Sequence, residues 1–285
     1  MKSITFAAVA VAILLTAPAN AAEASKGRIL LVGSSVNSMT LKDGRKIPTG
    51  YFLNELAVPA QRFIKAGYEV VVATPDGNAP AVDAISLTPG LFHGGEAALN
   101  QAMQFVLTNP SMQKPQKLDA VVRAGLDDFV AIYVPGGRAP MVDLMESEAL
   151  GTALMHFHRT GKPTAMLCHG PIAFVATVKD PTAFRKAVVA GGATAAKAMT
   201  AGWAYAGYKM TLLSNVEEVS KEQALGGRMP FYIEDVVRDA GAVISVGPPA
   251  QPYVVVDREV ITGQNPASDE QLTDAVLAAL QNKSR

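Results

Sequence analysis

The sequence predicts an α/β protein built on one doubly wound parallel sheet. Three short apolar runs, at 28–34, 69–74 and 129–134, have the continuous hydrophobicity that is typical of strands buried on both faces. Between the first two runs, apolar residues recur at helical spacing over 51–66, and Gly67 supplies a stop. A strand, a helix and a second strand at this spacing make a parallel unit, and the alternation continues along the chain.

Two segments interrupt this alternation, 78–125 and 179–209. We predict that both are insertions, the first lying over one end of the sheet with a helix at 96–106. For the aromatic residues at 203–208 we expect ordinary packing rather than a lid. The other expected elements are helices at 147–160, from the cysteine turn to about 178, at 230–240 and at 268–281, and strands ending at Cys168 and at 210–213, 243–246 and 253–256.

The composition is that of a globular protein with a sizeable core. The chain has 285 residues, of which 49% are hydrophobic, and its 25 basic and 25 acidic residues balance. The sequence contains neither a basic block nor a basic amphipathic stretch. This pattern argues against nucleic acid or an anionic membrane surface as a partner.

Residues 1–21 are typical of a secretory signal peptide. Lys2 is followed by an apolar run over 4–17 and by a small-x-small cleavage site at 19–21. The run is shorter than the roughly 20 residues that span a bilayer, which favours cleavage over a membrane anchor. We therefore expect a single α/β domain over 22–285, located in the periplasm or secreted.

The single cysteine lies in the most informative stretch, 162–174. A short apolar run ends at Cys168, and Gly170-Pro171 then opens a segment with helical spacing, so the cysteine falls at a sharp strand-to-helix turn. A helix N-terminus and the adjacent His169 both favour a thiolate. A lone cysteine is often a small buried hydrophobe. Core packing, however, gives no reason for His-Gly-Pro to follow at once, so we predict a nucleophile.

The positions of the histidines limit the possible base. The four histidines are His93, His156, His158 and His169, and none lies after His169. The α/β-hydrolase and glutamine amidotransferase orders place the base histidine downstream of the nucleophile, so neither can be completed here. The simplest partner of Cys168 is His169 itself, and we expect surface or packing roles for the other three. No metal-ligand spacing appears, so we expect no metal.

Several short motifs occur in an order that resembles a known superfamily. They are Gly50-x4-Glu55-x3-Pro59, Ala66-Gly67-Tyr68-Glu69-Val70, Ala73-Thr74-Pro75-x-Gly77, Pro135-Gly136-Gly137, Cys168-His169-Gly170-Pro171 and the Ile-Thr-Gly-Gln-Asn-Pro-Ala-Ser segment at 261–268. Together they resemble the ThiJ/PfpI superfamily, with its class I glutamine amidotransferase-like fold, in the branch of the heat-shock-protein-31-type chaperones and glyoxalase III enzymes. The resemblance implies a flavodoxin-like sheet sandwiched by helices, with the insertions capping the site.

The resemblance also implies roles for individual residues. Glu55 matches a glutamate of the first helix that hydrogen-bonds the cysteine sulfur in protonated form, and burial there would raise its pKa. An acid that orients the histidine falls at Glu217 or Glu218, and we choose Glu218. The implied catalytic residues are Cys168, His169, Glu55 and Glu218, and the implied oxyanion and substrate-binding residues are Gly136, Gly137 and Gly170.

The activity implied by the resemblance is that of a cofactor-independent glyoxalase III, a lyase that converts methylglyoxal or glyoxal to lactate or glycolate without glutathione or metal. Glycated proteins are a further expected partner, and homodimers are common in the family. Two alternatives stay open: a holdase chaperone that binds unfolded proteins, or a redox-sensing stress protein whose cysteine oxidises. A cysteine peptidase is less favoured, because no histidine follows the cysteine segment.

Overall fold

The computed structural model describes residues 25–191 and 193–283, so the predicted signal peptide lies outside the described residues. The core of the protein is a seven-stranded sheet in the order β10-β11-β7-β6-β1-β4-β5, parallel except for the β10–β11 pair. Its strands are β1 (Arg28–Val32), β4 (Glu69–Thr74), β5 (Gln116–Lys117), β6 (Phe129–Val134), β7 (Thr164–Leu167), β10 (Val254–Asp257) and β11 (Val260–Gly263).

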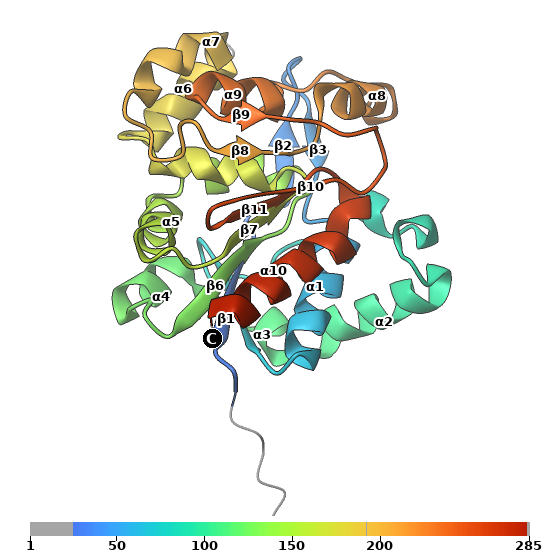
Figure 1. Cartoon of the computed structure of the whole chain (residues 1–285). Coiled ribbons are helices and arrows are strands. Elements are labelled where there is room, and N and C mark those ends of the chain that lie inside the picture. Colours follow the sequence, from blue (N-terminus) through green and yellow to red (C-terminus); the bar gives the residue numbers. More distant parts are fainter. Residues whose placement is uncertain (1–24, 192, 284–285) are drawn as a thin grey trace, which may run out of the picture.

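Helices cover both faces of the sheet (Figure 1). On one face α1 (Leu53–Lys65) packs against α2 (Gly95–Thr108) and α10 (Asp269–Lys283), and on the other α4 (Leu118–Ala124) packs against α5 (Glu148–Thr160). Because both faces are covered, the side chains of the central strand β1 from Ile29 to Val32 have no exposed surface. The predicted doubly wound, flavodoxin-like α/β fold is therefore confirmed.

A cap gathers at one end of the molecule (Figure 1). It contains α6 (Pro181–Gly191), α7 (Ala193–Ala196), α8 (Asn215–Leu225), α9 (Ile233–Ala240), and a parallel pair of β8 (Lys209–Met210) and β9 (Val243–Ile244). Trp203 Nε1 donates to the Phe174 carbonyl at 3.1 Å and to Thr177 Oγ1 at 3.0 Å, and the Tyr205 ring lies 4.5 Å from that of Phe174. These aromatic side chains pack between the cap and the sheet domain, as expected for them.

The structure corrects the prediction for 78–125. Residues 84–113 form two 3₁₀ turns (Ala84–Ser86 and Pro89–Leu91), α2 and α3 (Pro110–Gln113). α2, which contains the predicted helix at 96–106, packs on α1, and α3 contacts β4. The rest of the segment supplies the edge strand β5, which pairs with β4, and then α4, which leads back to β6. The sequence does not predict this strand, because it is a Gln-Lys pair at the sheet edge, where no apolar run is required.

Other elements also differ from expectation. The segment after the cysteine, Gly170–Thr177, is a 3₁₀ helix rather than an α-helix. The strand β11 was not predicted, and neither was the hairpin of β2 (Ser38–Thr40) and β3 (Lys46–Pro48). Short 3₁₀ turns also occur at Ala139–Met141, Leu144–Glu146, Lys197–Thr200 and Pro266–Ser268. In the described part of the chain, no helix combines the length and apolar character needed to cross a bilayer.

Candidate active site

Cys168 lies at the tight turn between β7 and the 3₁₀ helix that opens at Gly170. Its φ is 58°, which is left-handed and unfavourable for a side chain other than glycine. The turn is held from both sides, because the Cys168 amide donates to the Gly263 carbonyl at 2.9 Å and the Leu213 amide donates to the Cys168 carbonyl at 3.0 Å. Backbone strain at one buried, doubly anchored residue points to a functional position.

His169 connects the sulfur to an acid. The Cys168 Sγ lies 3.4 Å from His169 Nδ1, and His169 Nε2 makes a short hydrogen bond with Glu218 Oε2. An ionised carboxylate can only accept, so Nε2 carries the proton and Nδ1 presents its lone pair to the thiol. His169 can therefore act as the base toward Cys168. The structure thus places Glu218, and not Glu217, against the histidine.

Glu218 is an anion with a buried counter-charge. Arg138 donates to its Oε1 through Nε at 3.0 Å and Nη2 at 2.9 Å, and both side chains are buried. Burial would raise the pKa of Glu218, but His169 and Arg138 outweigh it and lower that pKa to about 2. Glu217 instead bonds to Ser214, Gln264 and Asn265, where it closes the cap of α8.

Glu55 approaches the sulfur from α1. Its Oε2 accepts the Gly136 amide at 2.8 Å, and its carboxyl forms a hydrogen bond with Cys168. Burial raises the pKa of Glu55 to about 8, although the hydrogen bonds from Cys168 and Gly136 oppose this shift. The side chain is fully buried. At neutral pH Glu55 is therefore mostly protonated and can donate a proton beside the sulfur.

The resting thiol differs from the thiolate that the sequence led us to expect. Burial raises the pKa of Cys168 well above its usual range, and the neighbouring carboxyl groups of Glu55 and Glu218 raise it further. The expected helix N-terminus is replaced by a short 3₁₀ helix. A hydrogen bond from the Gly137 amide lowers the pKa but does not reverse the shift. The thiol therefore stays protonated until His169 takes its proton.

The three glycines predicted at the oxyanion position have different environments. The Gly137 amide bonds to the Cys168 sulfur and so faces the reacting atom. The Gly136 amide is already used by Glu55. A Cβ on Gly170 would lie 2.7 Å from the Val134 carbonyl oxygen, so that glycine allows close packing of the turn on β6. Of the three, Gly137 is the one that this geometry directs at the reacting atom.

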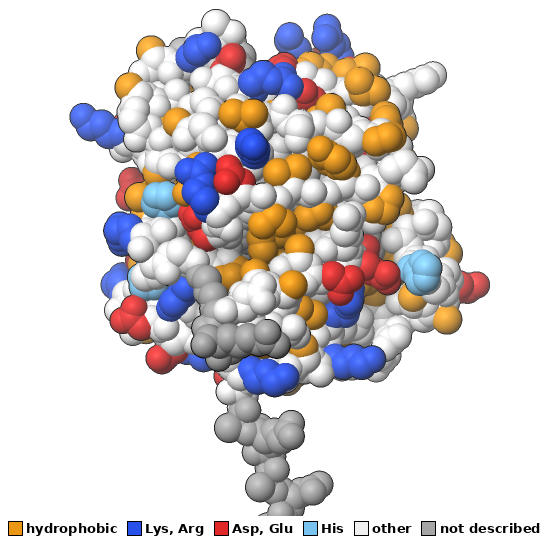
Figure 2. Space-filling model, in the orientation of Figure 1, with side chains coloured by type: hydrophobic (Ala, Val, Ile, Leu, Met, Phe, Trp, Pro, Cys, Tyr) orange, Lys and Arg blue, Asp and Glu red, His pale blue; other side chains and the backbone are white. Residues whose placement is uncertain are grey.

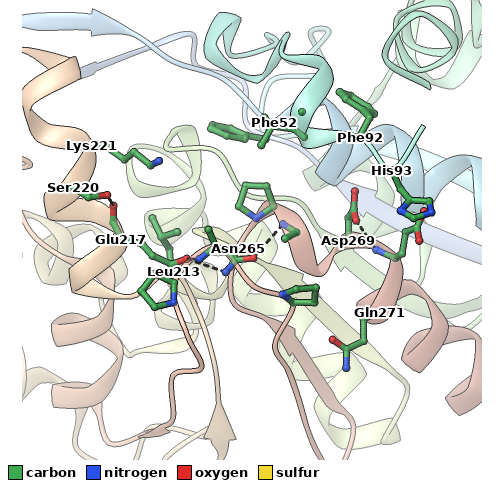
Figure 3. A pocket seen from close by; sticks show the side chains of 18 of the residues that line it. Phe52, Phe92, His93, Leu213, Glu217, Ser220, Lys221, Asn265, Asp269 and Gln271 are labelled. Carbon is green, nitrogen blue, oxygen red and sulfur yellow. Dashed lines mark hydrogen bonds between the residues drawn. The ribbon is translucent and has the colours of Figure 1, made fainter. Parts of the chain in front are cut away.

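A cleft of about 860 Å³, whose lining side chains are drawn in Figure 3, is bordered by chain neighbours and hydrogen-bond partners of these residues. Its walls include Phe52, which directly precedes α1, and Leu213, whose amide holds the Cys168 carbonyl. Cys168 and His169 do not line the cleft, and each is only 2% exposed. The reacting sulfur thus lies behind the wall of a cleft rather than at its surface.

The other histidines lie away from the sulfur. His93 lines the cleft, whereas His158 bonds to Glu259 at 2.7 Å and His156 lies 3.7 Å from Asp127. Residues 25–191 and 193–283 contain no cluster of three or more His, Cys, Asp or Glu side chains that could hold a metal ion.

Arg138 is the site residue that sequence reasoning missed. A signal for it was present, since Arg138 is a lone charge between Gly136-Gly137 and the apolar segment 139–142. Such a charge is buried only when it is paired.

Comparisons with known proteins show the family of this chain. A family model described as ThiJ/PfpI family-like matches residues 48–209, which is more than half of the chain. The chain belongs to the ThiJ/PfpI family. A ThiJ/PfpI relative in Schizosaccharomyces pombe, named glutathione-independent glyoxalase hsp3101, is 27% identical over 265 residues and covers 91% of this chain and 98% of its own.

Two further similarities cover most of the chain. A Staphylococcus aureus protein named protein/nucleic acid deglycase HchA is 23% identical over 266 residues, with 90% of this chain and 82% of its own covered. The crystal structure of glyoxalase III from Candida albicans superposes with a TM-score of 0.66 at 22% identity, covering 90% of this chain and 97% of that one. The last similarity concerns the ThiJ/PfpI fold alone.

Proposed function

We propose that this protein is a glutathione-independent glyoxalase that converts methylglyoxal or glyoxal to lactate or glycolate. The Cys168 sulfur adds to the aldehyde carbon and forms a hemithioacetal. The hydrogen on that carbon then moves as a proton, through an enediol, to the neighbouring carbon, which leaves a thioester on the sulfur. Water hydrolyses the thioester and returns the thiol, so the reaction consumes one water and no external oxidant or reductant.

One observation carries this proposal: the sulfur lies between a base and a protonated acid. His169 Nδ1, at 3.4 Å, takes the thiol proton, and the ionised Glu218 stabilises the resulting imidazolium. Once the thiol proton has passed to the hemithioacetal oxygen, His169 is free to take the hydrogen from the former aldehyde carbon and to return it to the neighbouring carbon. Glu55, with a pKa of about 8, can donate a proton to the neighbouring carbonyl oxygen and recover one from the hemithioacetal hydroxyl. The Gly137 amide is placed to stabilise the oxyanion that forms on addition.

Methylglyoxal loss and lactate formation, measured without glutathione on the full chain, test the proposal. Turnover should be abolished in Cys168→Ala and fall about 10²-fold or more in Glu55→Gln, which keeps the shape but not the titrating group. Glu259→Gln is the matched control, because the Glu259 side chain is only 7% exposed but bonds to His158 and Tyr208 and not to Cys168. Wild-type protein with a reduced thiol and no turnover would disprove the proposal.

The names of the two curated relatives support the same chemistry and suggest a second substrate class. A hemithioacetal on Cys168 could equally form from a dicarbonyl attached to a protein side chain, and its release would register as deglycation. The 860 Å³ cleft beside the site is large enough to receive such a side chain. Release of glycated peptide adducts that fails in Cys168→Ala but not in Glu259→Gln would support this extension.

Exposed valines favour a second candidate function, that of a holdase. Val216 and Val219 of α8 are 67% and 51% exposed, and Val256 of β10 is 57% exposed. Figure 2 shows hydrophobic side chains gathered on the face that carries β10 and α8. Suppression of aggregation of an unfolded client that persists in Cys168→Ala would support this activity, and loss of suppression in that variant would oppose it.

We further propose export of this protein to the periplasm or cell exterior, with residues 1–21 removed from a single domain at 22–285. The basic start, the apolar run and the small-x-small site support this proposal. N-terminal sequencing of the protein from fractionated cells tests it, and an intact Met1 in the cytoplasmic fraction would refute it. A homodimer, implied by the family, is a prediction for sedimentation analysis.

A further inference from the structure

A buried arginine lies behind the residues assigned to the reaction. Arg138 is 3% exposed and directs two nitrogens, Nε and Nη2, at the same oxygen of Glu218. The other oxygen, Oε2, is thereby left to His169. Arg138 bonds to Glu218, and Glu218 bonds to His169, so two hydrogen bonds separate Arg138 from the base. None of the hydrogen bonds described here joins Arg138 to the sulfur.

The arrangement divides the two oxygens of one carboxylate between two partners. A carboxylate that bonded to His169 alone could rotate about its terminal torsion, because this torsion is broad in side chains. Two N–H bonds from one planar guanidinium converge on Oε1, hold that oxygen in place and so restrict the rotation of the carboxylate. The orientation of the His169 ring, and so the direction of its Nδ1 lone pair toward Cys168, depends on this fixed carboxylate.

The charge of Arg138 matters as much as its geometry. A thiolate at Cys168 forms close to the negative charge of Glu218, which contributes to raising the pKa of the thiol. Arg138 balances that charge within the same buried network. The titratable and charged groups that face the network are Glu55 from α1, Asp83 from the segment before the first 3₁₀ turn, His169 and Cys168 from the turn after β7, and Glu218 from α8.

We propose that Arg138 is a positioning residue of this site, which fixes Glu218 so that one carboxylate oxygen orients His169 and which compensates the Glu218 charge so that a thiolate can form at Cys168. The inference rests on the proposed function for its catalytic meaning. Its physical content, however, concerns the reactivity of one thiol and can be measured without any dicarbonyl substrate.

The test is the rate of alkylation of the thiol by iodoacetamide as a function of pH. Cys168 is the single cysteine of the sequence, so the reagent reports on this site alone. Arg138→Gln keeps a donor but removes the charge. Its alkylation midpoint should move upward by about one pH unit, which makes the reaction at neutral pH about tenfold slower. Arg138→Lys keeps the charge but cannot make both bonds, so its midpoint should stay and its plateau rate should fall.

Two further variants separate positioning from packing. In a Glu218→Gln background Arg138 has no carboxylate to hold, so adding Arg138→Gln there should shift the midpoint much less than it does in the wild type. Arg185→Gln is the matched control, because Arg185 donates to the Met141 carbonyl, three residues after Arg138, and makes no hydrogen bond to Glu218 within the described part of the chain. This control should titrate like the wild type.

The proposal is overturned if Arg138→Gln titrates like Arg185→Gln, or if Arg138→Gln shifts the midpoint by the same amount with and without Glu218→Gln. Should Arg138→Gln fail to fold, Arg138→Lys decides, and a wild-type plateau in that variant would overturn the proposal. If the wild-type protein turned over no dicarbonyl while the variants still showed these shifts, the proposed function would be wrong and the role of Arg138 would stand.

Discussion

Gly136→Ala tests whether the close contact between Glu55 and Cys168 determines activity. A Cβ at this position would lie 2.5 Å from Glu55 Oε2, 2.6 Å from Cys168 Cβ and 2.6 Å from the Leu167 carbonyl oxygen. The last two atoms belong to the turn itself and cannot swing aside. The segment 134–137 must therefore shift, and Glu55 must move with it or be displaced.

The expected costs follow from this crowding. Overpacking of this kind destabilises by about 1–3 kcal/mol. For a chain of this size each kcal/mol lowers Tm by roughly 2–4 °C. The effect on turnover should be larger, because a displacement of about 1 Å at a reacting group can cost ~10²-fold in rate. The variant should thus stay folded at room temperature and yet lose most of its methylglyoxal turnover.

Gly90→Ala provides the matched control for this substitution. Gly90 lies in the 3₁₀ turn Pro89–Leu91 at the cleft, and an added Cβ there has no atom within 4 Å among the described residues. Calorimetry and lactate formation should show wild-type behaviour in this control. If Gly136→Ala matched Gly90→Ala in both Tm and turnover, the proposed dependence on the Glu55 contact would be refuted.

Three other predictions concern stability and pH. The pKa of Glu55 is raised from 4.5 to about 8, so the unfolded chain loses this proton at a lower pH than the folded protein does. Between pH 4.5 and about 8 the free energy of unfolding should therefore fall as pH rises, by up to about 1.4 kcal/mol per pH unit. Denaturant titrations should show a weaker pH dependence of that free energy in Glu55→Gln. Turnover that needs protonated Glu55 should decline as pH rises through about 8, and an alkaline limb unchanged in Glu55→Gln would contradict this assignment. Trp203→Phe removes the bonds to Phe174 and Thr177 and should lower the free energy of unfolding by about 1–3 kcal/mol in chemical denaturation, while the reactivity of the distant thiol is kept.

The parallel sheet was predictable because its strands are local and strongly apolar. The segments 69–74 and 129–134 match β4 and β6 residue for residue, since a strand buried on both faces must be apolar throughout. The sheet contains other strands that cannot be predicted from an apolar run. β5 is a Gln-Lys pair that is defined by its register with β4, and β11 follows β10 after only two residues, so neither stands out in the sequence.

The site likewise contains residues that the sequence predicts and features that only the folded structure determines. Cys168 and His169 could be found from a local motif, and Glu55 from its resemblance to a family glutamate. The choice between Glu217 and Glu218 depended on the direction in which each side chain leaves α8, which spacing alone does not determine. The protonated state of the thiol depends on burial and on charges brought in by distant segments, so a sequence motif predicted its reactivity but not its resting charge.

The base of this site is the chain neighbour of its nucleophile, whereas the two carboxyl groups, Glu55 and Glu218, lie 113 and 50 residues from Cys168 in the sequence. The covalent backbone therefore keeps the nucleophile and the base adjacent, while the orientation of the imidazole still depends on Glu218. Substitutions in α1 or α8 can alter where protons go without separating sulfur from imidazole. Descent with modification on this scaffold can therefore exchange one reaction for another while inheriting the same nucleophile.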